Sequence, residues 1–408
     1  MKTRRKFLKD TAFATVGIGL SHHLSLAQTL HPSESNLVSQ TTNPWIELSS
    51  NAYLKNVQLI SQMAQNKPIM AVLKNNAYGL GDVQVAQILD QSAHIAGFAL
   101  VKDERCLALR GNGVSKPILL MGDFNEDLGM DLVKNAITLS AFSLESSNKI
   151  KKLASQGNKE VLVELYIDTG LGRMGMPYSK GVGWIKELAS TPNIKITGLF
   201  STLTTPMDFA QTQIQRFSNI IGQLKDNGIS PSRLHMAPSL SLLDLPESHF
   251  NTVRPGILLH GTYPLSKMDQ AKNVPLQPTY RLKAPVIRME KLHKGDTIGF
   301  SRFYKVEADE WIATLPIGWA DGYYSGAENG AKVLINDTLY NVVNVNASHC
   351  NLAIGPEKTV DVGDIATLIG PDQPEITPEG FGKLAGGHNY LQIQYKESIP
   401  KFVHDEFL

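Results

Sequence analysis

The sequence predicts an α/β protein, a (βα)8 barrel of the TIM type followed by a mostly-β C-terminal domain. Between Pro44 and Pro264, eight short apolar runs alternate with longer amphipathic stretches. This alternation is typical of parallel βα units, and eight such units can close a barrel. A polar, proline-flanked stretch at 264–278 indicates a domain junction, and short strand-like runs follow it. We therefore expect a barrel domain over 44–264 and a β domain over 276–408.

The N-terminus has the layout of a secretory signal peptide over residues 1–27. A basic start from Lys2 to Lys9 precedes a mostly apolar run, Thr11–Leu20, and a small-residue site ends at Ala27. The apolar run is too short to span a bilayer. Two adjacent arginines followed by Phe-Leu-Lys resemble a twin-arginine signal, although an ordinary secretory signal with coincidental arginines is the alternative. We expect export to the periplasm, a flexible leader over 28–43 and no membrane association once the signal is removed.

The barrel prediction depends on eight candidate strands, whose lengths suit buried strands. They are Ile69–Leu73, Ile95–Val101, Pro117–Met121, Ile137–Phe142, Val161–Ile167, Ile194–Leu199, Leu234–Ala237 and Val253–Leu259. Pro255 interrupts the last of them, which disfavours a regular strand there. Helical patterns such as Gly81–Asp90 and Gln211–Asn227 lie between strands.

The second domain is predicted from shorter strand-like runs separated by Gly, Asp and Pro. These are Trp311–Ile317, Lys332–Ile335, Thr338–Val345, Ile365–Leu368 and Tyr390–Tyr395. No internal repeat accompanies them, so a repeat architecture is not expected.

Composition narrows the possible partners. The 408 residues are 42% hydrophobic and 19% charged, and the formal net charge is +1. This balance is globular and gives no electrostatic reason to expect a nucleic-acid partner. The two cysteines, Cys106 and Cys350, exclude a disulfide framework and show no zinc-ribbon spacing.

The first chemically suggestive residue is Lys74, at the C-terminal tip of the first predicted barrel strand. Active sites of (βα)8 barrels lie at that end of the strands. Partial desolvation lowers the pKa of an amine, and a neutral amine can form a Schiff base with an aldehyde. Position alone favours the other interpretation, a snorkelling or salt-bridged lysine at a strand end.

Four motifs together resemble the alanine racemase family, which consists of fold type III pyridoxal-phosphate enzymes. Ala-Val-Leu-Lys-Asn-Asn-Ala-Tyr-Gly-Leu-Gly, at 71–81, resembles the cofactor-lysine motif of that family. The segments Asp168–Gly175, Val253–Gly261 and Trp311–Tyr323 resemble its later motifs in the same order. The resemblance extends from about Pro44 to Val403.

The resemblance implies that pyridoxal 5'-phosphate is bound covalently to Lys74, which also serves as one acid/base. It implies a substrate-carboxylate and cofactor contact for Arg173, whose fork fits a carboxylate. Arg254 would face the pyridine nitrogen, where it cannot donate a proton as an aspartic acid would, and this favours racemisation over transamination. The implied phosphate ligands are Tyr78, Ser239 and the backbone N–H groups of Gly256 and Ile257.

The sequence also departs from the family. A racemase needs an acid and a base on opposite faces of Cα. The family takes the second group from a tyrosine of the partner subunit, and the matching residue here is Phe300. His349 is our candidate replacement, because histidine titrates near neutral pH, with Tyr304 and Tyr323 as further candidates. Thr202 occupies the position of a family histidine, and Tyr166 occupies the position of a family lysine.

We therefore expect a racemase that acts on alanine or on several amino acids. The resemblance implies a homodimer with shared active sites, which is also the commonest symmetry. A metal-assisted D-amino-acid lyase or dehydratase of the same fold is an alternative, suggested by the adjacent His349 and Cys350, although two ligands are fewer than catalytic zinc usually has. A pyridoxal-phosphate-binding homologue with impaired catalysis is the other alternative. We expect no resident metal.

Overall fold

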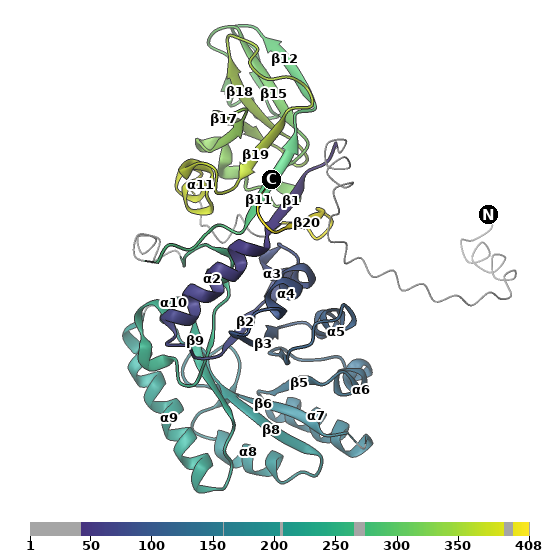
Figure 1. The fold of residues 1–408 in the computed structure, drawn as a ribbon, viewed down its shortest axis with the longest axis vertical. Helices are drawn as coiled ribbons and strands as arrows, with labels where there is room; N and C mark the ends of the chain where they lie inside the picture. Colours follow the sequence, from purple (N-terminus) through teal and green to yellow (C-terminus); the bar gives the residue numbers. More distant parts are fainter. Residues whose placement is uncertain (1–41, 158, 205–206, 265–273, 387–394, 408) are drawn as a thin grey trace, which may run out of the picture.

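A computed structural model of the chain describes residues 42–157, 159–204, 207–264, 274–386 and 395–407. The predicted signal peptide and leader lie outside these residues, apart from residues 42 and 43. Most of the predicted junction and all but the last residue of the run Tyr390–Tyr395 also lie outside them. Figure 1 shows a barrel at the bottom and a sheet-rich domain above it.

Eight parallel strands form a closed ring in the barrel, which confirms the predicted fold class. Their order is β5-β4-β3-β2-β10-β9-β8-β6, and a β5–β6 pairing closes the ring. Each of the eight predicted runs overlaps one of these strands. They are β2 (Ile69–Val72), β3 (Ile95–Leu100), β4 (Ile118–Leu120), β5 (Ile137–Ala141), β6 (Val161–Asp168), β8 (Ile194–Phe200), β9 (Arg233–Pro238) and β10 (Thr252–Arg254).

The last barrel strand is shorter than the run that predicted it. β10 ends at Arg254, directly before Pro255, and the chain continues as a 3-10 helix, η3 (Ile257–His260). Proline has no N–H to donate to a strand ladder, which explains the early end. A two-residue strand, β7 (Met176–Pro177), pairs with the end of β6.

Helices cover the outside of the ring. α9 shows why they pack there: its buried residues Ala210, Gln213, Phe217, Ile220 and Leu224 recur every three or four positions and therefore share one face. Full burial of each large apolar side chain on that face stabilises the fold by about 1.5–3 kcal/mol. The helices of this part are α2 (Ser50–Met63), α3 (Lys74–Tyr78), α4 (Asp82–Asp90), α5 (Asp103–Gly111), α6 (Glu126–Lys134), α7 (Leu144–Gln156), α8 (Gly181–Ala189), η1 (Met207–Phe209), α9 (Ala210–Asp226), α10 (Ser239–Asp244) and η2 (Pro246–Ser248).

The second domain is built on a nine-stranded sheet, in the order β12-β15-β18-β17-β16-β19-β11-β1-β20. A separate two-stranded hairpin, β13 with β14, accompanies it. The strands are β11 (Tyr280–Pro285), β12 (Arg288–Leu292), β13 (Thr297–Ile298), β14 (Tyr304–Lys305), β15 (Glu310–Leu315), β16 (Lys332–Ile335), β17 (Thr338–Val345), β18 (Cys350–Gly355), β19 (Ile365–Ile369) and β20 (Lys401–His404). Its helices are η5 (Trp319–Asp321), η6 (Ser325–Asn329), η7 (Pro374–Ile376) and α11 (Pro378–Leu384).

One strand crosses the predicted domain boundary. β1 (Trp45–Ser49) lies in the sequence range assigned to the barrel, but it pairs with β11 and β20 in the sheet of the second domain. All five of its residues are buried, so the strand is an internal member of that sheet. The barrel itself therefore begins with α2, and the chain passes through the second domain first.

The inner face of the barrel has a core of its own. Ile69 and Ala71 of β2 join the main core, whereas Met70 and Val72 belong to a smaller cluster with Ala99, Leu119, Tyr166 and Phe200. Alternate residues of a strand point to opposite faces, so the smaller cluster fills the interior of the ring. Within the described residues, no helix is both long and apolar enough to cross a membrane.

Candidate active site

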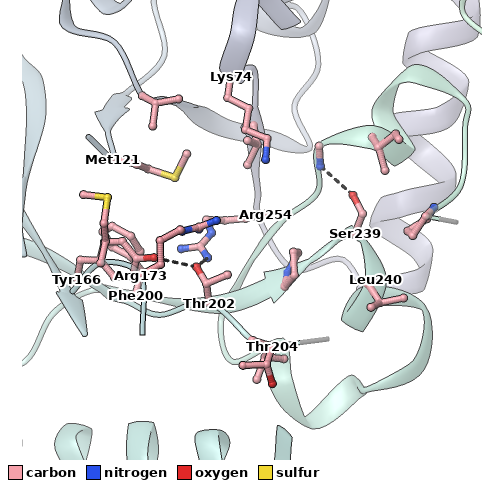
Figure 2. Close-up of a pocket in the computed structure, with 18 of the residues that line it drawn as sticks. Lys74, Met121, Tyr166, Arg173, Phe200, Thr202, Thr204, Ser239, Leu240 and Arg254 are labelled. Atoms are coloured by element: carbon pink, nitrogen blue, oxygen red, sulfur yellow. Dashed lines mark hydrogen bonds between the residues drawn. The ribbon is translucent and has the colours of Figure 1, made fainter. Parts of the chain in front are cut away.

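A cavity of about 770 Å³ opens at the C-terminal ends of the barrel strands (Figure 2). Seven of the eight residues predicted for the site line it. They are Lys74, Tyr78, Arg173, Ser239, Arg254, Gly256 and Ile257. The fold thus brings together side chains and backbone that lie up to about 180 residues apart in the sequence, at the end of the barrel where such enzymes act.

Lys74 begins an unusual turn, separated from the end of β2 by one residue. The next four residues, Asn75 to Tyr78, all have positive φ, between 49° and 59°, and Gly79 follows with φ 95°. Left-handed backbone costs a non-glycine residue roughly 1–2 kcal/mol, so this segment is strained. The side-chain oxygen of Asn76 offsets part of that cost by accepting the backbone N–H of Asp82 at 3.0 Å.

The turn directs the Lys74 amine into the cavity (Figure 2). Its Nζ lies 5.7 Å from the centre of the Tyr78 ring. Burial lowers the pKa of the Lys74 ammonium below its usual range, and the positive charge of Arg173 lowers it further. A larger fraction of the amine is therefore neutral near pH 7, which is the form that attacks a carbonyl carbon.

Polar groups gather at one end of the cavity around Gly256. The Gly256 N–H donates to Ser239 Oγ at 3.0 Å. A Cβ atom on Gly256 would lie 2.1 Å from the Tyr78 hydroxyl oxygen, so a glycine is needed for the close approach of the tyrosine. Two hydroxyls and a backbone N–H around a glycine form a concave donor set that suits a phosphate group.

Arg254 occupies the opposite part of the cavity and is buried. Its Nη1 lies 3.0 Å from His235 Nδ1, and its Nη2 donates to the carbonyl oxygen of Ser201 at 2.5 Å. Burial lowers the pKa of Arg254 to about 10, so its guanidinium still carries a positive charge at neutral pH. The ring nitrogen of a cofactor placed here would face a charged donor that does not readily give up its proton.

Glu164 and His235 support Arg254 from inside the barrel. Glu164 Oε2 lies 2.7 Å from His235 Nε2, and Arg233 Nε donates to Glu164 Oε1 at 2.7 Å. Burial lowers the pKa of His235 and outweighs the opposing effect of Glu164, and the positive charges of Arg254 and Arg233 lower it further, so the imidazole is neutral. We therefore assign the proton to Nε2, which donates to Glu164, and leave Nδ1 to accept from Arg254.

Neither Glu164 nor His235 was predicted from the sequence to belong to the site. Each interrupts an apolar run, Val161–Ile167 or Leu234–Ala237, and each side chain is fully buried. Ionisable residues are rarely buried without a partner. A charged residue within a predicted barrel strand was the signal that could have identified both.

The hydroxyls of Tyr166 and Thr202 lie side by side at the cavity wall. The Tyr166 Oη to Thr202 Oγ1 distance is 3.4 Å, and Thr202 Oγ1 lies 3.4 Å from Arg254 Nη2. The Tyr166 ring stacks on Phe200 with 4.4 Å between centroids. Figure 2 shows these residues grouped with Arg173 and Arg254, below Lys74.

The predicted replacements for the second acid/base lie elsewhere in the chain. His349 is outside the residues that line the cavity: it lies between β17 and β18, where its Nδ1 is 2.8 Å from Ser348 Oγ. The Tyr304 hydroxyl donates to Glu310 at 2.7 Å, and Tyr323 is buried in the core of the second domain. Within a single chain, His349 therefore lies away from the cavity, and its role as an acid/base stays a prediction.

The metal alternative has no support from the described part of the chain. Over those residues, no group of three or more His, Cys, Asp or Glu side chains could hold a metal ion. Cys350, next to His349, is buried, and burial raises the pKa of its thiol. A buried neutral thiol is a poor metal ligand.

Comparison with known families agrees with this geometry. The family described as "Alanine racemase, N-terminal domain" matches residues 48–264, and "Alanine racemase, C-terminal domain" matches residues 279–400. The chain is 33% identical over 367 residues to the alanine racemase of Methanococcus maripaludis, covering 88% of this chain and 97% of that protein. It is 30% identical to the alanine racemase of Clostridium tetani, covering 88% and 94% of the two chains.

Solved structures match over nearly the same length. The alanine racemase of Clostridium difficile superposes with a TM-score of 0.83 at 27% identity, covering 90% of this chain and 98% of that one. The enzyme from Streptomyces lavendulae superposes with a TM-score of 0.82 at 23% identity, covering 90% and 98%, which supports the fold.

Proposed function

This chain belongs to the alanine racemase family, and we propose that it interconverts L- and D-alanine with pyridoxal 5'-phosphate held on Lys74. The observation that carries the proposal is a single cavity that combines an amine of lowered pKa, a phosphate-sized donor set and a buried arginine. When bound, the cofactor acts as an electron sink that acidifies the substrate Cα–H. The two alternatives, a metal-assisted D-amino-acid lyase or dehydratase and a homologue with impaired catalysis, are not favoured.

Each part of the cofactor has a fitting partner in the cavity. Tyr78, Ser239 and the backbone of Gly256 and Ile257 would bind the phosphate, because they supply neutral hydrogen-bond donors around a glycine. Arg254 would hydrogen-bond the ring nitrogen and remain protonated. A ring without an added proton is a weaker electron sink, which favours quick return of the proton to Cα.

The remaining residues of the cavity would contact the substrate. Arg173 lines the same cavity, and its guanidinium can bind a carboxylate with two parallel hydrogen bonds. Apolar side chains lie around the rest of the wall, at Val72, Val101, Met121, Met174 and Leu203. Such a wall suits the methyl group of alanine and leaves room for other small apolar side chains, so we propose alanine as the main substrate and test a wider panel.

We further propose that the protein acts as a homodimer. Three aromatic side chains of the second domain are exposed: Phe300 by 99%, Phe303 by 85% and Trp319 by 57%. All three line one small recess next to the β13–β14 hairpin. Clustered exposed aromatics mark interaction surfaces, and a second copy is the simplest occupant. Sedimentation velocity at micromolar concentration should give a dimer, and a monomer at all concentrations would contradict this.

Export by the twin-arginine route is also proposed, on the basis of the basic start and apolar run within residues 1–27. Cell fractionation should find the mature protein in the periplasm. Replacing both Arg4 and Arg5 with lysine should retain it in the cytoplasm, whereas unchanged export would indicate the ordinary secretory route.

A chiral assay tests the catalytic proposal directly. Purified protein reconstituted with pyridoxal 5'-phosphate is incubated with L-alanine, and both enantiomers are quantified by chiral chromatography. We expect equal amounts of the two enantiomers at equilibrium, from either starting enantiomer, and no effect of a chelator. Absence of D-alanine, with cofactor shown to be bound, would contradict the proposal, and loss of turnover on chelation would favour a metal-dependent reaction.

A further inference from the structure

Racemisation needs a second proton-exchanging group besides Lys74. One group must take the proton from Cα on one face, and another must deliver a proton on the other face, or the configuration is not inverted. We propose that Tyr166 is this second acid/base. The inference rests on the proposed racemase function and names a further catalytic residue for it.

The composition of the cavity wall leaves few candidates. Among the described residues that line it, five have ionisable side chains: Lys74, Tyr78, Tyr166, Arg173 and Arg254. The Tyr78 hydroxyl lies against Gly256 in the phosphate donor set, away from a substrate Cα. Arg254 has a pKa of about 10 and arginine side chains in general stay protonated, so neither guanidinium is a suitable base. Tyr166 remains.

Tyr166 lies across the barrel from Lys74. Lys74 follows β2, and Tyr166 is on β6; four steps separate these strands in either direction around the ring of eight. The two strands therefore stand diametrically opposite each other. The side chains of Tyr166 and Val72 belong to the same interior cluster, which confirms that Tyr166 points inward. A substrate between β2 and β6 would thus meet an amine on one side and a phenol on the other.

The surroundings of Tyr166 suit a proton-exchanging phenol. Stacking on Phe200 fixes the plane of its ring, and Thr202 Oγ1 lies within 3.4 Å of both its hydroxyl and Arg254 Nη2. The positive charge of Arg254 can therefore balance a negative charge on the phenolate.

The proton inventory balances. In one direction neutral Lys74 takes the α-proton and becomes an ammonium, while the Tyr166 phenol gives a proton to the opposite face of Cα and becomes a phenolate. The reverse direction uses these two products: the phenolate takes the α-proton, and the Lys74 ammonium returns one. Repeated turnover in one direction needs only proton exchange with water to restore the neutral amine and the phenol.

The test is a Tyr166→Phe variant of the holoprotein, which keeps the ring on Phe200 and removes only the hydroxyl. Tyr178→Phe is the matched control, since Tyr178 lies outside the cavity and its ring packs on Arg216. Cofactor dissociation constant, visible absorbance and melting temperature are measured first, and we expect all three to stay close to wild type. Racemisation should fall by about 100-fold or more, as expected for loss of a general acid/base, and the control should be unaffected.

Exchange of the α-proton in D2O then separates a catalytic role from a structural one. Lys74 alone can still remove and return the proton on its own face, so Tyr166→Phe should exchange one enantiomer at nearly the wild-type rate and lose exchange of the other. Racemisation within threefold of wild type, or equal loss of both exchange rates, would overturn the proposal for Tyr166. If the wild-type protein racemises alanine and Tyr166→Phe does so at a similar rate, only the role of Tyr166 is rejected. If the wild-type protein does not racemise alanine, the proposed function is rejected as well.

Discussion

His235 Nδ1 lies 3.0 Å from Nη1 of Arg254, and His235 Nε2 lies 2.7 Å from Glu164. The imidazole therefore connects a buried carboxylate to the arginine that would face the ring nitrogen. Because neutral imidazole can accept at one nitrogen while it donates at the other, the arrangement fixes the position of Arg254 without adding a positive charge to the barrel interior. This buried chain of contacts gives the first prediction.

Replacing Glu164 with glutamine should destabilise the fold. The substitution keeps the shape of the side chain but removes the negative charge that faces Arg233 and His235. Breaking a buried ion pair by removing one partner costs about 3–5 kcal/mol. Urea unfolding should show a loss of this size. Glu187→Gln, at an exposed pair with Lys151, should cost less than about 1 kcal/mol, and equal losses in the two variants would refute the account.

Arg105 should stabilise the turn that carries Lys74. Its guanidinium pairs with the buried Asp82, contacts Asn76 Oδ1 at 3.4 Å and donates to Glu397 Oε1 at 2.9 Å. Arg105→Ala leaves a buried carboxylate without this cation, so we expect a loss of about 3–5 kcal/mol in urea unfolding. Cofactor affinity should fall as well, because the strained turn loses a support.

A lysine at position 105 provides the matched comparison. It keeps the positive charge but cannot form the same planar fork, so Arg105→Lys should recover only part of both losses. Full recovery of stability and cofactor affinity would show that charge alone matters at this position.

The barrel could be predicted from the sequence because its strands are short, apolar and regularly spaced. The eight runs from Ile69 to Leu259 each overlap a strand of the ring. β1 was assigned to the wrong part of the molecule for a physical reason: its neighbours β11 and β20 are more than 200 residues away, and no local pattern specifies such pairing.

Gly256→Ala should weaken cofactor binding with little effect on folding. The backbone φ of Gly256 is −123°, outside the left-handed region that favours glycine, but the new methyl group would lie 2.1 Å from the Tyr78 hydroxyl oxygen. The Tyr78 side chain would have to move out of the phosphate donor set. We expect the cofactor dissociation constant, measured by fluorescence titration, to rise about tenfold or more, which is the loss of roughly one good hydrogen bond.

Gly222→Ala is the control for this variant, because Gly222 lies in α9 and an added Cβ meets nothing within 4 Å. It should leave cofactor affinity unchanged. Wild-type affinity in Gly256→Ala would show that the phosphate is bound elsewhere.

Stability should fall as the pH drops below about 6.5. Burial lowers the pKa of His260 to about 3, whereas the pKa of an unfolded histidine is about 6.5. Between these values the unfolded chain binds a proton that the folded chain does not, so the contribution is complete above pH 6.5 and is lost as the pH falls toward 3. His235, whose pKa is also lowered by burial, acts in the same direction.

The size of this effect can be checked by urea unfolding at two pH values. Between pH 6.5 and pH 5, His260 alone should account for about 1.5–2 kcal/mol of the loss in unfolding free energy. His260→Phe should lose that much less over the same interval, and His293→Asn, at an exposed position, should behave like wild type. An identical pH slope in His260→Phe and wild type would contradict the assignment.

Only part of the site could be predicted from the sequence, because some of its residues depend on the arrangement of distant strands. Residues in contiguous motifs, such as Lys74 and Arg254, could be identified locally. The group that would act opposite Lys74 could not be identified in this way. Which strands face each other across a closed barrel depends on the order of all eight strands, and only that order places β6 opposite β2. Tyr166 therefore emerged from the topology, whereas His349, chosen by residue type, lies outside the cavity.

The central claim is a covalent link between the cofactor and Lys74. Protein reconstituted with pyridoxal 5'-phosphate is reduced with borohydride, digested and analysed by peptide mass spectrometry. The account predicts one stable pyridoxyl adduct, on the peptide that contains Lys74, and its absence from a folded Lys74→Ala variant. An adduct on a different lysine, or no adduct in protein that retains the cofactor, would contradict it.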